Sequence, residues 1–258
     1  DINFGQEEII PANNAAAAKQ LAGLGYVGAP AANRPMFPDR DWTHFNAIDY
    51  NAELDQILVS VHAFSEFWII DHSTTTQEAK GHAGGRSGKG GDLLYRWGNP
   101  RAYRAGGKED QTLFAQHNAH WIPTGLPGEG HILLFNNRQE DAGGKFSSVD
   151  EIVLPVDKHG AYQRTNGPAF GPKEAAWRYT APKKQDFYSN FISGVQRLPN
   201  GNTLICSGAH GILIEVTRDG DQVWKYINPT KESPFGKGGS GGPGSFSPPP
   251  IGNLLPDF

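Results

Sequence analysis

Histidine offers the most chemistry in this 258-residue chain, which contains nine of them. The stretch QHNAHW, residues 116–121, places His117 and His120 three residues apart, directly before an apolar run. Near neutral pH a histidine serves as a metal ligand, a general acid or base, or a nucleophile. Which of these roles applies depends on the residues that the fold places beside it.

Three segments of the chain end alike, and this repetition predicts the fold. YRWGNP (95–100), WRYTAP (177–182) and WKYINP (224–229) each read aromatic, basic, aromatic, two further residues and proline. Four short apolar runs precede or include each ending, and turn signals such as PNGN and DGD separate them. Four antiparallel strands in about 40 residues are typical of one propeller blade.

We therefore expect an all-β protein, a β-propeller of four-stranded antiparallel blades. Residues 1–235 are predicted to form a partial ring, with repeats near 41–100, 116–182 and 187–229, and residues 236–258 a Gly/Ser/Pro-rich tail. The 33 glycines and 19 prolines favour short strands, and helical periodicity appears only at residues 14–24. Three blades do not close a ring, so we expect the remaining blades or a second chain to complete it.

Composition argues against several classes of protein. A formal net charge of -4 argues against a nucleic-acid-binding surface. The chain has no apolar run of about 18 residues, so no membrane span is expected. The one cysteine, Cys206, excludes an intrachain disulfide and is interpreted as a small buried apolar residue in the strand TLICSG.

Blade geometry predicts which polar residues share a face. The first strand of a blade is innermost, and its start lies on the same face as the turn between strands two and three. Strand starts then carry His44, His117, His120 and Asn190; the turns SVHAF, FNNRQ and SGAHG carry His62, Asn137 with Arg138, and His210. We expect a functional centre where these residues converge, whereas His131 and His159 are interpreted as hydrogen-bonded residues of turns.

The predicted cluster favours an anion over a metal ion. His-x-x-His in a β context lacks the helical i,i+4 spacing that brings two imidazoles onto one ion, and no carboxylate or cysteine ligand is obvious nearby. Several imidazoles and an arginine suit a transferring group with three equatorial oxygens. A sulfuryl group fits because it carries less charge than a phosphoryl group, so neither a metal nor another cofactor is expected.

Longer motifs resemble a known family. QHNAHWIPTGLPGEGHILLFNN, SSVDEIVLPVD, RLPNGNTLICSGAHG and HFNAIDYNAELDQILVSVHAFSEFWIIDH are similar to segments of the bacterial arylsulfate sulfotransferases, over roughly residues 41–230. The resemblance implies a periplasmic or secreted six-bladed propeller, often a homodimer, of which this chain holds the later blades. It also implies sulfuryl transfer from an aryl sulfate to a phenol, without a nucleotide donor, through a sulfated histidine.

The resemblance also suggests roles for individual residues. His210 in SGAHG matches the nucleophile, and Arg138 after LFNN matches the sulfate-binding arginine. His44 in WTHFN and one histidine of QHNAHW match transition-state stabilisers; His117 keeps the preceding glutamine and His120 keeps the adjacent tryptophan. His62 and Asn137 are further candidates for substrate binding. Two alternatives remain open, namely a non-catalytic exported propeller that binds or supports a partner, and a metal enzyme that uses the same histidines.

Overall fold

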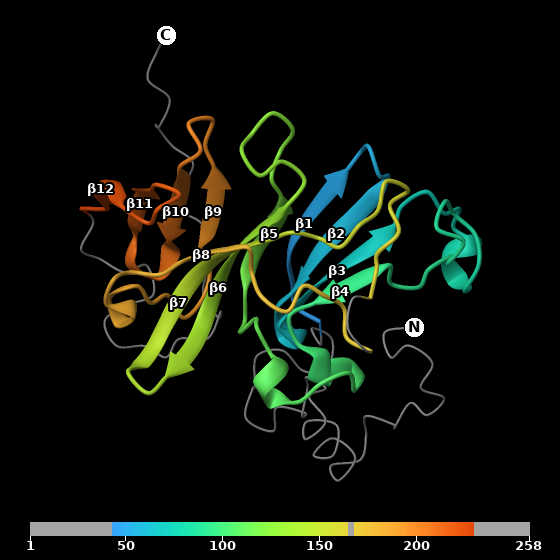
Figure 1. Ribbon diagram of the computed structural model, residues 1–258, viewed down its shortest axis with the longest axis horizontal. Helices are drawn as coiled ribbons and strands as arrows, with labels where there is room; N and C mark the ends of the chain where they lie inside the picture. The colour runs from blue at the N-terminus through green and yellow to red at the C-terminus, as the bar shows by residue number, and fades with distance from the viewer. Residues whose placement is uncertain (1–42, 165–167, 230–258) are drawn as a thin grey trace, which may run out of the picture.

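Three four-stranded antiparallel sheets make up the computed structural model, which describes residues 43–164 and 168–229 (Figure 1). Each sheet is formed by four strands that are consecutive in the chain. The expected all-β fold and the expected four strands per repeat are therefore confirmed. The helix expected at residues 14–24 and the tail expected at 236–258 lie outside the described residues.

The strands follow the three repeats in order. The first sheet contains β1 (Phe45–Asn51), β2 (Gln56–Val61), β3 (Glu66–Asp71) and β4 (Tyr95–Trp97). The second contains β5 (His117–Trp121), β6 (Ile132–Asp141), β7 (Gly144–Ile152) and β8 (Trp177–Tyr179). The third contains β9 (Gly194–Arg197), β10 (Thr203–Ser207), β11 (Ile212–Val216) and β12 (Gln222–Ile227).

Short 3₁₀ turns are the only helical elements among the described residues. They are η1 (His62–Phe64), η2 (Glu78–Lys80), η3 (Pro100–Tyr103), η4 (Lys108–Asp110), η5 (Lys184–Asp186) and η6 (Gly208–His210). None of these helices is long and apolar enough to cross a membrane. The turns η1 and η6 occupy equivalent positions, because each joins the second and third strands of its sheet.

The basic residue of the repeated ending fastens the fourth strand to the third. Arg96 on β4 donates to Glu66 on β3 from Nε at 3.0 Å, and both side chains are fully buried. Arg178 on β8 makes two bonds to Asp150 on β7, at 2.6 and 2.9 Å. In the third sheet Lys225 lies opposite Ile214 and is exposed. Two of the three repeats thus use an arginine–carboxylate pair where strand four meets strand three.

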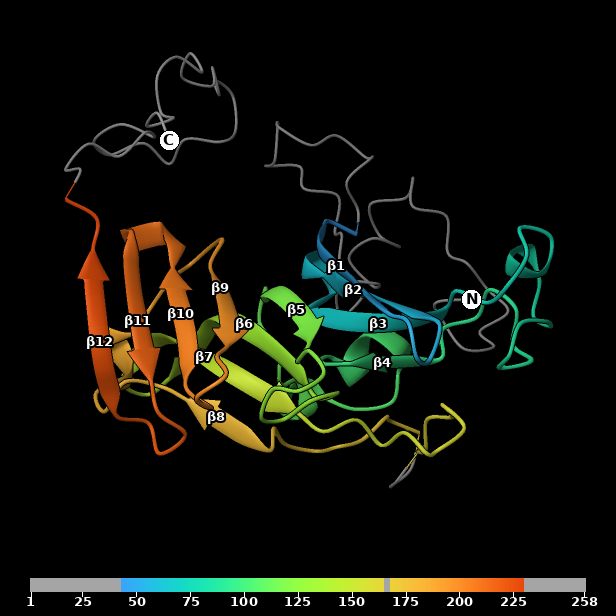
Figure 2. The same cartoon turned by 90° about the horizontal axis from the view of Figure 1, so that it is seen from above.

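The second sheet lies between the other two and is buried on both faces (Figures 1 and 2). Alternate residues of β6 point to opposite sides. Ile132 and Leu134 pack with residues of the first sheet, whereas Leu133 and Phe135 pack with Ile205 and its neighbours in the third. The first strands lie next to one another, with β1 beside β5 and β5 beside β9.

The hairpin β6–β7 corrects one expectation. The prediction of a turn between strands at FNNRQ is wrong, because β6 continues through this segment to Asp141. Within β6, the residues Asn137 and Arg138 form a β-bulge opposite Ser147. Hydrogen bonds explain why these polar residues remain in a strand. The Ser147 hydroxyl donates to the Asn137 carbonyl at 2.6 Å, and the Arg138 amide donates to the Phe114 carbonyl at 2.9 Å.

Apolar side chains are exposed on the two outer sheets. On β1 they are Phe45, Ile48 and Tyr50, and on β12 they are Val223, Trp224, Tyr226 and Ile227. The described residues form three separate sheets and not a closed ring.

A buried carboxylate joins the second sheet to the third. Glu151 on β7 accepts a hydrogen bond at 2.6 Å from Arg197 on β9, and both side chains are fully buried. Arg218, in the turn before β12, and His131 also contact the Glu151 carboxylate. The guanidinium of Arg197 is therefore neutralised only while this carboxylate is present.

Replacement of Glu151 by glutamine is expected to lower the free energy of unfolding by about 3 kcal/mol or more, because it leaves Arg197 as an unpaired buried charge. Denaturant unfolding measures this change. The matched control is Asp186→Asn, which breaks the exposed Lys183–Asp186 pair and should leave stability unchanged. Equal stability of Glu151→Gln and the unmodified chain would contradict the role given to Glu151.

Candidate active site

Three imidazoles lie in contact at one end of the first two sheets. The ring centroids of His44 and His62 are 4.9 Å apart, and those of His62 and His117 are 5.1 Å apart, both in edge-to-face geometry. His44 precedes β1, His62 begins η1 and His117 begins β5. Among the described residues these ring contacts do not extend to His120 or His210. We call His44, His62 and His117 the imidazole cluster.

Backbone hydrogen bonds hold the first two imidazoles together. The His62 amide donates to the His44 carbonyl and the Ala63 amide to the Thr43 carbonyl, both at 3.2 Å. His44 has a φ of 48°, which turns the chain at the start of β1. The turn η1 is therefore fixed to the segment that carries His44.

His117 is oriented by the buried amide of Asn137. Its Nδ1 lies 2.8 Å from Asn137 Oδ1, across the β-bulge of β6. Burial lowers the pKa of His117 below its ordinary value of 6.5, and the charges of His44 and Arg138 lower this pKa further. The hydrogen bonds with Asn137 and with the Ala115 carbonyl act in the opposite direction.

Residues 189–193, here called the bridge segment, link the remaining candidate residues. The Arg138 side chain donates from Nε to the Asn190 carbonyl at 2.7 Å. The Ser193 hydroxyl accepts from the Gly208 amide at 3.0 Å, and so the bridge segment is joined to η6, which carries His210. Asn190, expected at a strand start, instead lies in this segment, four residues before β9 begins.

The bridge segment has an unfavourable backbone conformation. Ile192 has a φ of 47° and Ser193 a φ of 94°. This region is uncommon for any residue other than glycine and is a true outlier for a β-branched residue such as isoleucine. Such conformations occur preferentially at functional sites, where the surrounding structure maintains them.

His62 and His210 lie in equivalent turns, but at different positions within those turns. His62 is the first residue after β2, whereas His210 is the third residue after β10 and is exposed. Its Nδ1 lies 3.4 Å from the Ser207 hydroxyl. His210 is thus connected to the imidazole cluster through the bridge segment and Asn137.

His120 lies further along β5 than His117. It pairs with Leu133 on β6, whereas His117 pairs with Phe135. Its Nδ1 bonds the Asn118 carbonyl at 2.8 Å. Of the two histidines in QHNAHW, His117 is the one that the structure places beside His62.

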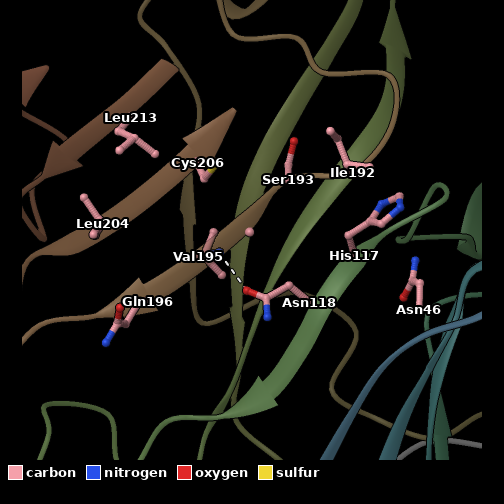
Figure 3. A pocket seen from close by; sticks show the side chains of 11 residues that line it. Asn46, His117, Asn118, Ile192, Ser193, Val195, Gln196, Leu204, Cys206 and Leu213 are labelled. Atoms are coloured by element: carbon pink, nitrogen blue, oxygen red, sulfur yellow. Dashed lines mark hydrogen bonds between the residues drawn. The ribbon is translucent and has the colours of Figure 1, made fainter. Parts of the chain in front are cut away.

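A groove of about 480 Å³ begins at His117 and crosses one face of the third sheet (Figure 3). Its polar end is formed by Asn46, His117, Asn118 and Ser193. Ile192 lies beside His117, and the other end is mainly apolar, with lining residues Val195, Leu204, Cys206 and Leu213, together with Gly194 and Gln196. An amphipathic groove of this kind suits a small ligand with one charged end and one apolar end.

The sequence patterns did not identify Asn118 and Asn46, which are among the polar residues of the groove. Asn118 has a φ of 56° at a bulge of β5, and its Oδ1 accepts from the Val195 amide at 2.8 Å. Asn46 donates from Nδ2 to the Gln116 carbonyl at 2.7 Å. The signal for Asn118 was present, since asparagine tolerates the left-handed region and stands here between two histidines. The bridge segment gave no comparable signal.

Carboxylates near the other histidines serve local contacts. His131 bonds Glu151 and His82 bonds Asp92, both at 2.7 Å, and His159 is exposed. Within residues 43–164 and 168–229, no group of three or more His, Cys, Asp or Glu side chains is arranged to hold a metal ion.

The family model for arylsulfotransferases (ASST) matches residues 29–234, which include all three sheets and the imidazole cluster. The chain belongs to the arylsulfotransferase family. No curated protein sequence matches this family member significantly.

Among solved structures, the chain is similar to a protein of unknown function from Bacteroides caccae, with 13% identity and a TM-score of 0.37. The similarity covers 74% of this arylsulfotransferase-family chain and 48% of the solved chain. The chain therefore spans about half the length of that structure.

Proposed function

We propose that this chain transfers a sulfuryl group from an aryl sulfate to a phenolic acceptor. The observation that carries the proposal is the imidazole cluster at the polar end of an amphipathic groove, in a member of the arylsulfotransferase family. The cluster offers hydrogen-bonding imidazoles to a sulfate, and Arg138 offers positive charge. The groove offers apolar side chains to an aromatic ring.

The proposed reaction has two steps, and His210 is the proposed nucleophile. An imidazole nitrogen of His210 attacks sulfur, the bond from sulfur to the donor oxygen breaks, and the phenolate leaves with that electron pair. A phenol oxygen then attacks the sulfur of sulfohistidine, and the nitrogen recovers its electron pair. His44, His62 and Arg138 are proposed to stabilise the charge on the equatorial oxygens.

The groove is the proposed site for the aromatic ring of the substrate. Leu204 and Cys206 are two residues apart on β10 and so lie on the same face, and Cys206 pairs with Leu213 on the adjacent strand β11. An aryl ring on these side chains would place its ester oxygen toward the polar end that contains His117. Apolar burial of the ring supplies binding energy without a further charged group.

We also propose that the three sheets are blades of a larger propeller in the periplasm or outside the cell. The equivalent topologies, the adjacent first strands and the exposed apolar residues of β1 and β12 support this arrangement. Further blades or a second copy of the chain would cover those residues.

The isolated chain is therefore expected to self-associate. Light scattering coupled to gel filtration should give a mass above the 28.0 kDa of one chain. The double variant Val223→Lys/Ile227→Lys on β12 should reduce the association, because charge on an exposed edge strand opposes pairing. A stable monodisperse monomer of the unmodified chain would contradict the blade proposal.

The transfer reaction is tested with 4-nitrophenyl sulfate as donor and phenol as acceptor. Nitrophenolate release should require phenol, persist in the presence of a chelator and fall by at least about 1,000-fold in His210→Ala, because the nucleophile is lost. The matched control is His159→Ala, an exposed histidine outside the site. A sulfuryl adduct on His210, found by mass spectrometry before phenol is added, is the second expected result.

Three outcomes would contradict the proposal. Absence of turnover and of an adduct would favour a binding module. Turnover lost with the chelator and restored by a metal ion would favour a metal enzyme. An adduct on a histidine other than His210 would reassign the nucleophile.

Cys206 provides a direct test of the groove because it is the only cysteine of the chain. Burial raises the pKa of the Cys206 thiol, so alkylation is best followed near pH 9, where more thiolate is present. In the His210→Ala variant, 4-nitrophenyl sulfate should slow alkylation of Cys206 severalfold, because the aryl ring covers the thiol. Inorganic sulfate, which lacks the ring, should have little effect. Equal alkylation rates with and without the aryl sulfate would exclude this position for the ring.

A further inference from the structure

The amide of Asn137 has a single possible orientation. Its side chain is fully buried, and Nδ2 donates to the carbonyls of Ser189 at 2.9 Å and Ile192 at 2.8 Å. Both amide hydrogens are thereby used. Exchanging the nitrogen and oxygen would place the amide oxygen against two carbonyl oxygens, which is unfavourable. The oxygen Oδ1 must therefore be the atom that faces His117.

This orientation determines the tautomer of His117. Asn137 Oδ1 can only accept a hydrogen bond, and it lies 2.8 Å from His117 Nδ1. Nδ1 therefore carries the hydrogen, and in the neutral imidazole the lone pair is on Nε2. The β-bulge makes this contact possible, since it directs Asn137 away from the regular strand pattern.

The surroundings of His117 favour the neutral form. The charged or titratable groups that face it are His44 and Arg138, which lower its pKa, and His62, whose ring lies at 5.1 Å. Burial is the largest cause of the lowered pKa. Near neutral pH, His117 thus presents Nε2 as a proton acceptor and not as a cationic donor.

We propose that Asn137 is a positioning residue that fixes His117 as the proton acceptor for the phenol in the second step of transfer. The phenol proton moves to His117 Nε2 as the phenol oxygen bonds to sulfur, and the bond from sulfur to the His210 nitrogen breaks. His117 lines the groove in which the phenol ring is placed. This inference rests on the proposed function and assigns His117 a role other than charge stabilisation.

The tautomer is measured directly in the unmodified chain. Long-range proton–nitrogen NMR correlation with ¹⁵N-labelled histidine should show hydrogen on Nδ1 of His117 at pH 7.5. The exposed His159 serves as a reference for a histidine in water. Hydrogen on Nε2 of His117 would overturn the inference, and this result does not depend on the folding of any variant.

The proton-transfer role is tested in the second step alone. Chain carrying sulfohistidine is mixed with phenol over a range of pH, and the rate should fall as pH drops below the lowered pKa of His117. In Asn137→Asp one carboxylate oxygen still accepts from Nδ1 and stabilises the imidazolium, so this acidic limb should move up by about one pH unit. The other carboxylate oxygen replaces the donor of the two bonds to Ser189 and Ile192, so the variant is first checked for native folding. Asn200→Asp, at an exposed turn, is the matched control and should not move the limb.

The outcomes separate the two proposals. Suppose that sulfuryl transfer occurs, but that the acidic limb is unchanged in Asn137→Asp and persists in a variant that lacks His117. The role of His117 as proton acceptor is then wrong, and the transferase function stands. If the unmodified chain transfers no sulfuryl group, the proposed function fails and this role fails with it. Asn137→Ala should mix the two tautomers and slow the second step more than the first.

Discussion

Buried polar groups that must find partners inside the protein determine how the second and third sheets meet. Glu151 neutralises Arg197 at one point of this interface, and Asn137 satisfies two carbonyls of the bridge segment at another. An unpaired buried charge or donor costs more free energy than a typical hydrogen bond contributes. The apolar contacts around Phe135 and Ile205 stabilise the interface, but the polar pairs determine its alignment.

The candidate site depends on the same alignment. The bridge segment joins Asn137, Arg138 and the turn that carries His210, so a shift between the sheets would separate all three. The groove also uses both sheets, because His117 lies at the start of β5 while Cys206 lies on β10. Catalytic geometry is held most accurately by side chains that are themselves fixed by packing and hydrogen bonds. The structure provides such support for His117 in particular.

Sequence patterns were sufficient for the strands and for the proximity of His44 and His62. The repeated aromatic–basic–aromatic endings correspond to β4, β8 and β12, and the contact of His44 with His62 follows from the start of one strand and the turn between the next two. Alternating apolar residues and turn residues are local features, so a short stretch of sequence is enough to recognise a strand and its ends.

The parts that could not be predicted depend on contacts between distant residues. FNNRQ has the composition of a turn, yet Asn137 and Arg138 remain in β6 because segments far along the chain satisfy them. His62 is the first residue after β2, whereas His210 is the third residue after β10. This difference depends on where each strand ends, and aligning the repeats does not determine those ends. The bridge segment has an ordinary composition, and its importance comes from the carbonyls it presents to Asn137.

The backbone of Ile192 implies a conflict between stability and the proposed activity. Glycine or asparagine at this position would adopt a φ of 47° more easily than isoleucine does. A search for stabilising substitutions would therefore select one of these two residues. The same change would give the backbone carbonyl of residue 192 more freedom. This carbonyl is one of the two that accept hydrogen bonds from Asn137. A more thermostable variant obtained in this way would have a less well-ordered histidine, which is a common compromise in enzymes under selection for function.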